Sequence, residues 1–111
     1  MIELQIKPLS VNEAFKGKRF KTPKYDSFIH SMLFLLPKID LPKSPYSIDI
    51  VFGYSSRASD IDNALKSFLD CLVKKYGFDD REIYQMNVKK EIVKKGSEFI
   101  KFKINEYISN K

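Results

Sequence analysis

Residues 60–80, DIDNALKSFLDCLVKKYGFDD, carry the clearest periodic pattern in this chain of 111 residues. Large apolar side chains recur there at helical spacing and fall on one face: Leu65, Phe68, Leu69, Leu72 and Tyr76. Gly77 follows, at the position where a left-handed residue commonly ends a helix. The stretch therefore predicts an amphipathic helix that packs on a core and has paired aspartates at both ends.

Three further elements are predicted on the N-terminal side of this helix. Residues 1–7 alternate between apolar and polar side chains, as does the segment 48–53, and each pattern is typical of a half-buried strand. Between them, Thr22 is a suitable helix cap and Pro23 a suitable first residue, so we expect a helix over 23–36.

Two apolar-rich segments follow on the C-terminal side, at 82–93 and 99–104. The short polar link between them contains Gly96 and favours a β-hairpin. The element order is then β-α-β-α-β-β. This order predicts an α+β fold, a single small domain over 1–111 with a mixed sheet and two helices packed on one face.

Composition indicates one core and a polyanionic partner. Hydrophobic residues make up 43% of the chain and aromatic residues 14%, which excludes intrinsic disorder. Lys and Arg number 20 against 14 Asp and Glu, which gives a formal net charge of +6. A basic surface of this kind attracts polyanions such as nucleic acids.

Several classes of protein and site are disfavoured by what the sequence lacks. The longest apolar run is far short of the roughly 20 residues that span a bilayer, and the N-terminus has no signal-peptide pattern. Cys71 is the only cysteine and His30 the only histidine, which argues against disulfides, a zinc site and a Cys/His nucleophile pair. We expect a soluble, cytoplasmic protein whose chemistry depends on carboxylates, lysines and hydroxyls.

Basic side chains gather near the N-terminus and on the last predicted hairpin. Residues 15–25, FKGKRFKTPKY, contain no acid and five bases: Lys16, Lys18, Arg19, Lys21 and Lys24. Arg57 lies close in sequence to Asp60 and Asp62, and the last predicted hairpin carries four further bases: Lys89, Lys90, Lys94 and Lys95. Such groups contact phosphates without reading sequence. Phe15 or Phe20 is a candidate for stacking on unpaired bases, the alternative being that each anchors its loop to the core.

Aspartates gather at the two ends of the predicted helix. Asp60 and Asp62 alternate, so in an extended segment their carboxylates would point to the same side. Asp79 and Asp80 lie past the other end, and a helix of about 14 residues separates the two pairs by roughly 20 Å. If the two pairs belong to one site, then either the next strand runs back beside the helix start or Asp80 acts across a dimer.

Asp62, Lys66 and Asp70 are spaced four residues apart and form one stripe on the polar face of the helix. Carboxylates beside a phosphate-binding surface are what Mg²⁺ requires, with Mn²⁺ as a second possibility, and Mg²⁺ activates water for phosphodiester attack. Lys66 is placed to stabilise charge on the phosphate.

A purely structural interpretation of the same residues stays open. Asp60 or Asp62 would then cap the helix, and Lys66 would form an ordinary ion pair with Asp70. Asn63 has the same ambiguity, because it either caps the helix locally or orients a neighbouring carboxylate.

The strings DIDNALKSFLDCL and GFDDREI resemble the signature of the RusA family of Holliday junction resolvases. Seven positions fall in register with it: Asp60, Asp62, Asn63, Lys66, Asp70, Leu72 and Asp80. The opening stretch KPLSVNEAF is also similar to the start of that family, in which a turn after the first strand holds a key asparagine, here Asn12.

This resemblance implies a homodimeric, Mg²⁺-dependent endonuclease that binds four-way DNA junctions and nicks two opposed strands. It assigns Asp60, Asp62 and Asp80 as catalytic metal-binding acids and Lys66 as the catalytic lysine. The role of Asp70 is less defined, since an ion pair with Lys66 or Lys74 would also explain it. A two-fold dimer suits paired cuts, and Leu33 and Phe34 are interface candidates unless they fill the monomer core.

Two other functions are compatible with the sequence. One is a non-catalytic module that binds DNA or RNA through its basic loop, with the aspartates as helix caps. The other is a nuclease with the same site and a looser preference for flaps and other branched DNA.

Overall fold

The computed structural model, which describes residues 1–17 and 20–109, is built around strand β4 (Tyr46–Tyr54). β4 pairs antiparallel with β6 (Phe99–Glu106) on one side and parallel with β5 (Ile83–Ile92) on the other. β1 (Ile2–Leu4) adds to the free side of β6, also antiparallel, so the strand order is β1-β6-β4-β5. β5 is therefore an edge strand, and β4 is enclosed by neighbours.

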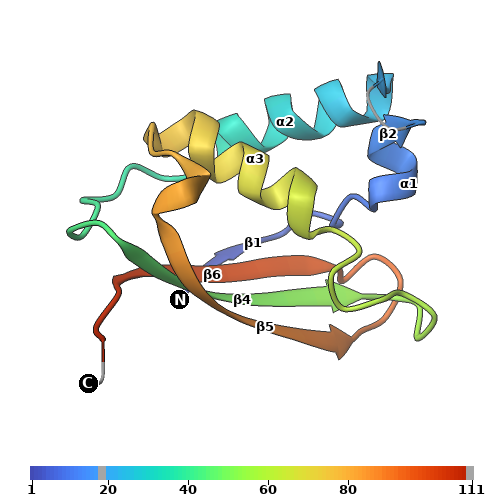
Figure 1. Ribbon diagram of the computed structural model, residues 1–111. Coiled ribbons are helices and arrows are strands. Elements are labelled where there is room, and N and C mark those ends of the chain that lie inside the picture. Colours follow the sequence, from blue (N-terminus) through green and yellow to red (C-terminus); the bar gives the residue numbers. More distant parts are fainter. Residues whose placement is uncertain (18–19, 110–111) are drawn as a thin grey trace.

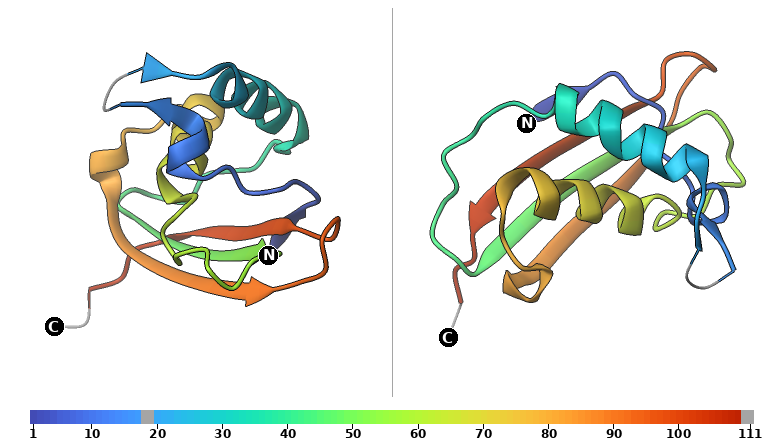
Figure 2. Two further views of the ribbon diagram at one scale, coloured as in Figure 1. Left: turned by 90° about the vertical axis from the view of Figure 1, so that its right-hand side faces the viewer. Right: turned by 90° about the horizontal axis from the view of Figure 1, so that it is seen from above.

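Helices α2 (Pro23–Leu35) and α3 (Leu65–Tyr76) lie on one face of this sheet, and no helix formed by the described residues lies on the opposite face (Figures 1 and 2). The core between the layers is largely aromatic. Phe68 of α3 packs edge-on against Phe52 of β4 and Phe102 of β6, with ring centroids 5.9 and 5.5 Å apart. All three side chains are fully buried, so the stripe that predicts α3 is also the stripe that holds it on the sheet.

The α+β class, the mixed sheet and the placement of both long helices on one face are confirmed. The helix predicted over 23–36 is α2, and Gly77 ends α3 with a φ of 73°. The short helix α1 (Val11–Ala14) was not predicted, because it is too brief to give a periodic pattern. A small sheet of β2 (Phe15–Lys16) and β3 (Phe20–Lys21) follows it, around Gly17, where the sequence indicates a hairpin-like tip. Within the described residues, no helix is long and apolar enough to cross a membrane.

The hairpin prediction for the last two strands is wrong. β5 and β6 follow each other in sequence but do not pair, because β4 lies between them. β4 buries alternate side chains completely at Ile48, Ile50 and Phe52, and it therefore takes the central position. β5 joins it in parallel through α3, which supplies the crossover that a parallel pair requires.

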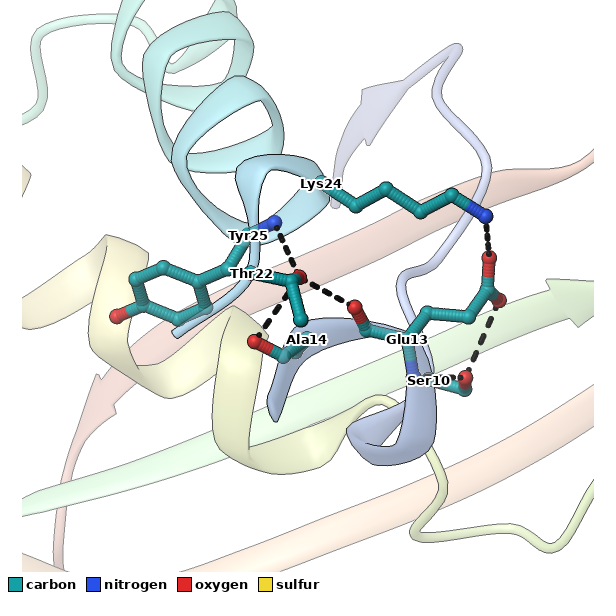
Figure 3. Close-up of polar contacts among 6 residues, drawn as sticks. All are labelled: Ser10, Glu13, Ala14, Thr22, Lys24 and Tyr25. Atoms are coloured by element: carbon teal, nitrogen blue, oxygen red, sulfur yellow. Dashed lines mark hydrogen bonds and ion pairs between the residues drawn. The ribbon is translucent and has the colours of Figure 1, made fainter. Parts of the chain in front are cut away.

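Thr22 connects α1, the small sheet and α2 (Figure 3). Its hydroxyl lies 2.5 and 3.2 Å from the carbonyl oxygens of Glu13 and Ala14, between which it shares one proton. The same oxygen accepts the backbone N–H of Tyr25 at 3.2 Å and so caps α2. Glu13 in turn binds Ser10 and Lys24, which fixes the short helix beside the longer one.

Replacing Thr22 with valine should lower the free energy of unfolding by about 1–2 kcal/mol, since the shape is kept while the cap and its bonds to α1 are lost. Thr22→Ser keeps the hydroxyl and is the matched control, with an expected change below about 0.5 kcal/mol. Urea denaturation of the three proteins measures both values. Equal stability of the valine and serine variants would contradict this role.

Candidate active site

The two aspartates before α3 lie in a turn. Helix α3 begins at Leu65, and residues 61–64 form a turn in which the Asn63 N–H donates to the Asp60 carbonyl at 3.0 Å. The expected extended pair is therefore absent, and the carboxylates of Asp60 and Asp62 need not share a side. The N-cap of α3 is Ala64, and no side chain caps it, so the interpretation of Asp60 or Asp62 as a helix cap is wrong.

Two hydrogen bonds hold this turn against the rest of the fold. The buried Tyr54 hydroxyl, at the end of β4, accepts the Ala64 N–H at 3.3 Å. The Val11 N–H, at the start of α1, donates to the Asn63 carbonyl at 2.8 Å. Burial raises the pKa of Tyr54 to about 12, and the nearby Asp62 and Asp60 carboxylates add to that rise. The hydroxyl is thus protonated and neutral beneath the turn at residues 61–64, which we call the acidic turn because it carries Asp62 and follows Asp60.

An open groove of about 440 Å³ runs along α3 and collects three of the four predicted catalytic residues. Its lining is Asp62, Leu65, Lys66, Leu69, Asp70 and Asp80. The stripe predicted for Asp62, Lys66 and Asp70 therefore faces one groove. Asp60 is exposed in the turn and is not part of the lining.

Asp80 reaches this groove within one chain. It lies in the 3₁₀ helix η1 (Asp80–Glu82), which joins α3 to β5. Its neighbour Asp79 caps η1 and pairs with Arg81 at 3.0 Å, and the hydrogen bonds from Arg81 lower the pKa of Asp79. Asp79 therefore has a structural role, while Asp80 faces the groove, and a partner subunit is not needed to bring it to Asp62.

The lining offers oxygen donors suited to a hard divalent cation. Among the described residues, no three His, Cys, Asp or Glu side chains are close enough together to hold a metal ion by themselves. Mg²⁺ commonly takes only one or two carboxylates and completes its shell with waters and substrate phosphate oxygens. The groove fits an ion bound in that manner, with Asp62, Asp70 and Asp80 as the available carboxylates.

Lys66 and Asp70 do not pair with each other. The Lys66 ammonium lies over the ring of Phe15, 4.6 Å from its centroid. The Asp70 carboxylate instead accepts the Tyr25 hydroxyl at 3.0 Å. The proposed ion pairs from Asp70 to Lys66 or Lys74 are therefore not formed. The roles of Phe15 and Tyr25 were missed, because nothing in a single sequence links them to residues about fifty positions away.

The N-terminal bases lie on or beside the small sheet. Lys16 and Lys21 are exposed on β2 and β3, and Asn12 is exposed on α1. Lys24 is also exposed, and its ammonium is 3.4 Å from Glu13. The predicted contacts Lys18 and Arg19 lie outside the described residues.

The two aromatic candidates of this hairpin differ in burial. Phe15 is half-buried and packs against the core, with its ring 5.3 Å from that of Tyr25. Phe20 is 75% exposed. Phe15 therefore anchors the hairpin, and Phe20 is the ring available to an outside partner.

The remaining bases lie at the end of the sheet where the acidic turn begins. Arg57 is in the loop after β4, and Lys94 and Lys95 are in the turn between β5 and β6. The two segments are tied together, because Lys90 donates to the Ser59 carbonyl at 2.7 Å and the Val93 N–H to the Tyr54 carbonyl at 2.8 Å. Figure 1 shows both segments at the same end as α1 and β2.

Comparison with known families gives one match that covers most of the chain. The family model described as Endodeoxyribonuclease RusA matches residues 10–103. This range contains α1, the small sheet and every residue that lines the groove. A search of curated proteins finds no match.

Tyr54→Phe should lower the free energy of unfolding by about 1 kcal/mol at neutral pH, because the Ala64 N–H loses its acceptor. The free energy of unfolding of the variant should also fall less than that of the wild type at alkaline pH. Since the pKa of Tyr54 is raised to about 12 on folding, its stabilising effect is complete below the ordinary value near 10 and is lost as the pH rises toward 12. Denaturant unfolding at pH 8 and between about pH 10 and 12 measures both effects.

The matched control for this change is Tyr84→Phe, since the Tyr84 side chain is 65% exposed. It should follow the wild type at every pH. A Tyr54→Phe variant that loses stability as steeply as the wild type in alkali would contradict the burial of a neutral hydroxyl under the turn.

Proposed function

Because this chain belongs to the RusA family of endodeoxyribonucleases, we propose that it resolves four-way (Holliday) DNA junctions by paired nicks in DNA recombination and repair. The observation that supports this most is the single groove along α3. It collects Asp62, Lys66 and Asp80 from both ends of the helix in one chain. Basic segments lie around it, so a phosphate backbone held by them would pass over carboxylates and an ammonium group.

The acidic residues and the lysine of the groove have different roles in this proposal. Asp62 and Asp80 would hold Mg²⁺ or Mn²⁺, and a metal bound there would supply activation of water and neutralisation of charge on the phosphate. Lys66 places its ammonium against the scissile phosphate and stabilises the negative charge that develops there. Asp60 would be the third metal-binding acid. It lies outside the groove lining, so the turn at residues 61–64 would have to rearrange for it to join the other two.

The basic residues bind the arms of the junction without reading sequence. Arg57, Lys94 and Lys95 lie in segments at the same end of the fold as α1 and β2, where Asn12, Lys16, Lys21 and Lys24 add to them. Lys18 and Arg19 are assigned to this set from the sequence alone. Phe20 is exposed among them and is suited to stack on bases that are unpaired at the branch point. Asn63 supports the turn that presents Asp62.

A homodimer completes the proposal, because a two-fold symmetric junction needs two equivalent cuts. Of the two interface candidates, Leu33 is half-buried and packs on the core of its own chain. Phe34 is 88% exposed on α2 and makes the better candidate for contact with a second copy.

Purified protein with Mg²⁺ should nick a synthetic four-way junction, and EDTA should abolish the cutting. Asp62→Asn and Asp80→Asn should each slow it by roughly 100-fold or more, since each removes a carboxylate that would hold the metal. Junction binding should survive in both variants. A gel with junction, flap and linear duplex, each with and without Mg²⁺, measures the rates and separates a resolvase from a flap nuclease or a binding module.

The matched control is Asp79→Asn, one residue from Asp80 and outside the groove. It should retain cutting within about threefold of the wild type, because asparagine also caps a helix well. Undiminished cutting by Asp62→Asn and Asp80→Asn would refute the assigned roles, and binding with no cutting by any form would favour the binding module.

Phe34→Glu should convert the proposed dimer to a monomer, because a charge in an apolar contact is poorly tolerated. Sedimentation velocity measures the change, and Leu35→Glu on the same helix, where the side chain is 40% exposed, is a control for general effects of charge. A wild-type protein that sediments as a monomer at high concentration and on junction DNA would rule out the dimer.

A further inference from the structure

Lys66 and Asp70 lie one turn apart on α3, at the spacing at which oppositely charged side chains on a helix usually pair. Their charged ends are instead held by two aromatic residues from another part of the chain. Phe15 of β2 lies under the Lys66 ammonium at 4.6 Å, and Tyr25 of α2 donates its hydroxyl to Asp70 at 3.0 Å. The helix thus presents a separated cation and anion.

The two aromatic residues form one unit that is fixed to the fold. Their ring centroids are 5.3 Å apart with an interplanar angle of 48°. Tyr25 is only 2% exposed, and its backbone N–H is bound by the cap residue Thr22. The pKa of Tyr25 is raised mainly by burial and, to a smaller extent, by the hydrogen bond to Asp70. Its hydroxyl therefore remains a donor at neutral pH.

This arrangement keeps Lys66 available to an incoming phosphate. Among the residues that the structure describes, no carboxylate lies within 4.0 Å of the Lys66 ammonium. If Tyr25 did not hold Asp70, the spacing of four would let that carboxylate neutralise the lysine. A ring face under an ammonium holds it without neutralising its charge.

We infer that Phe15 and Tyr25 are positioning residues that keep the Lys66 ammonium apart from Asp70 and directed into the groove. The inference rests on the proposed nuclease function and adds two residues to it, neither of which touches the reacting phosphate. It also connects DNA binding to the site. Phe15 and the exposed Lys16 are neighbours on β2, and the ammonium of Lys21 on β3 lies 5.0 Å from the Tyr25 ring.

The test combines kinetics with a measurement on Lys66 itself. Phe15→Leu removes the ring but keeps an apolar side chain, and Tyr25→Phe removes only the hydroxyl. Each should lower the single-turnover cutting rate on a four-way junction by about threefold to tenfold, while junction affinity without metal changes less than about twofold. Phe15→Tyr keeps an aromatic ring at this position, so its cutting rate should be close to that of the wild type.

The spectroscopic measurement follows the ε-methylene protons of Lys66 by NMR in the free protein. In the wild type the adjoining ammonium nitrogen is 4.6 Å from the Phe15 ring centroid, so the ring current should shift these protons. This ring-current shift should vanish in Phe15→Leu and weaken in Tyr25→Phe, where Asp70 is released to attract the ammonium. Tyr76→Phe is the matched control, since it also deletes one tyrosine hydroxyl. That hydroxyl, on α3, donates to the Pro37 carbonyl at 2.7 Å, and Tyr76 does not line the groove.

Unchanged Lys66 resonances in both variants would overturn the inference, as would a rate loss that Phe15→Tyr does not recover. Backbone NMR spectra show whether Phe15→Leu folds normally, and Tyr25→Phe decides the outcome if it does not. If the wild type cuts no junction, the nuclease proposal fails separately, and the Lys66 shifts alone decide whether the aromatic pair positions this lysine.

Discussion

The parallel pairing of β4 with β5 is the constraint on which the rest of the molecule depends. Two parallel neighbours cannot be joined by a tight turn, so the chain must return along the sheet, and α3 makes that return. The acidic turn then lies at one end of α3 and η1 at the other. A groove along the helix can therefore draw Asp62 and Asp80 from segments that a helix of 12 residues separates in sequence.

Burial on one side of α3 sets the chemistry on the other. Phe68 and Leu72 are fully buried against the sheet, which leaves the stripe of Asp62, Lys66 and Asp70 toward solvent. The small sheet and α2 then act on this stripe from the side, through Phe15 and Tyr25. Fold stability and the electrostatics of the groove thus both depend on α3. Thr22, which caps α2, is connected to the groove through Tyr25.

The strongly periodic parts of the sequence predicted the fold class, both long helices and the stripe of Asp62, Lys66 and Asp70. The prediction that β5 and β6 form a hairpin was wrong. β4 pairs with a strand on each side and so lies between them, and these pairings join residues that are distant in sequence. The start of α3 was misplaced because Asp60 and Asp62 are good cap residues, yet backbone bonds to Tyr54 and Val11 fix a turn there. The contacts of Lys66 with Phe15 and of Asp70 with Tyr25 could not be predicted, because nothing in the neighbouring sequence indicates them.

The most direct test of this account is the location of a bound metal. Crystals of the protein soaked in Mn²⁺ give an anomalous difference map that identifies the ion and its ligands. The account predicts a peak in the groove along α3, coordinated by the carboxylates of Asp62 and Asp80 from one chain. A saturating soak that places Mn²⁺ away from both carboxylates, or on Asp80 with ligands from a second copy only, would contradict it.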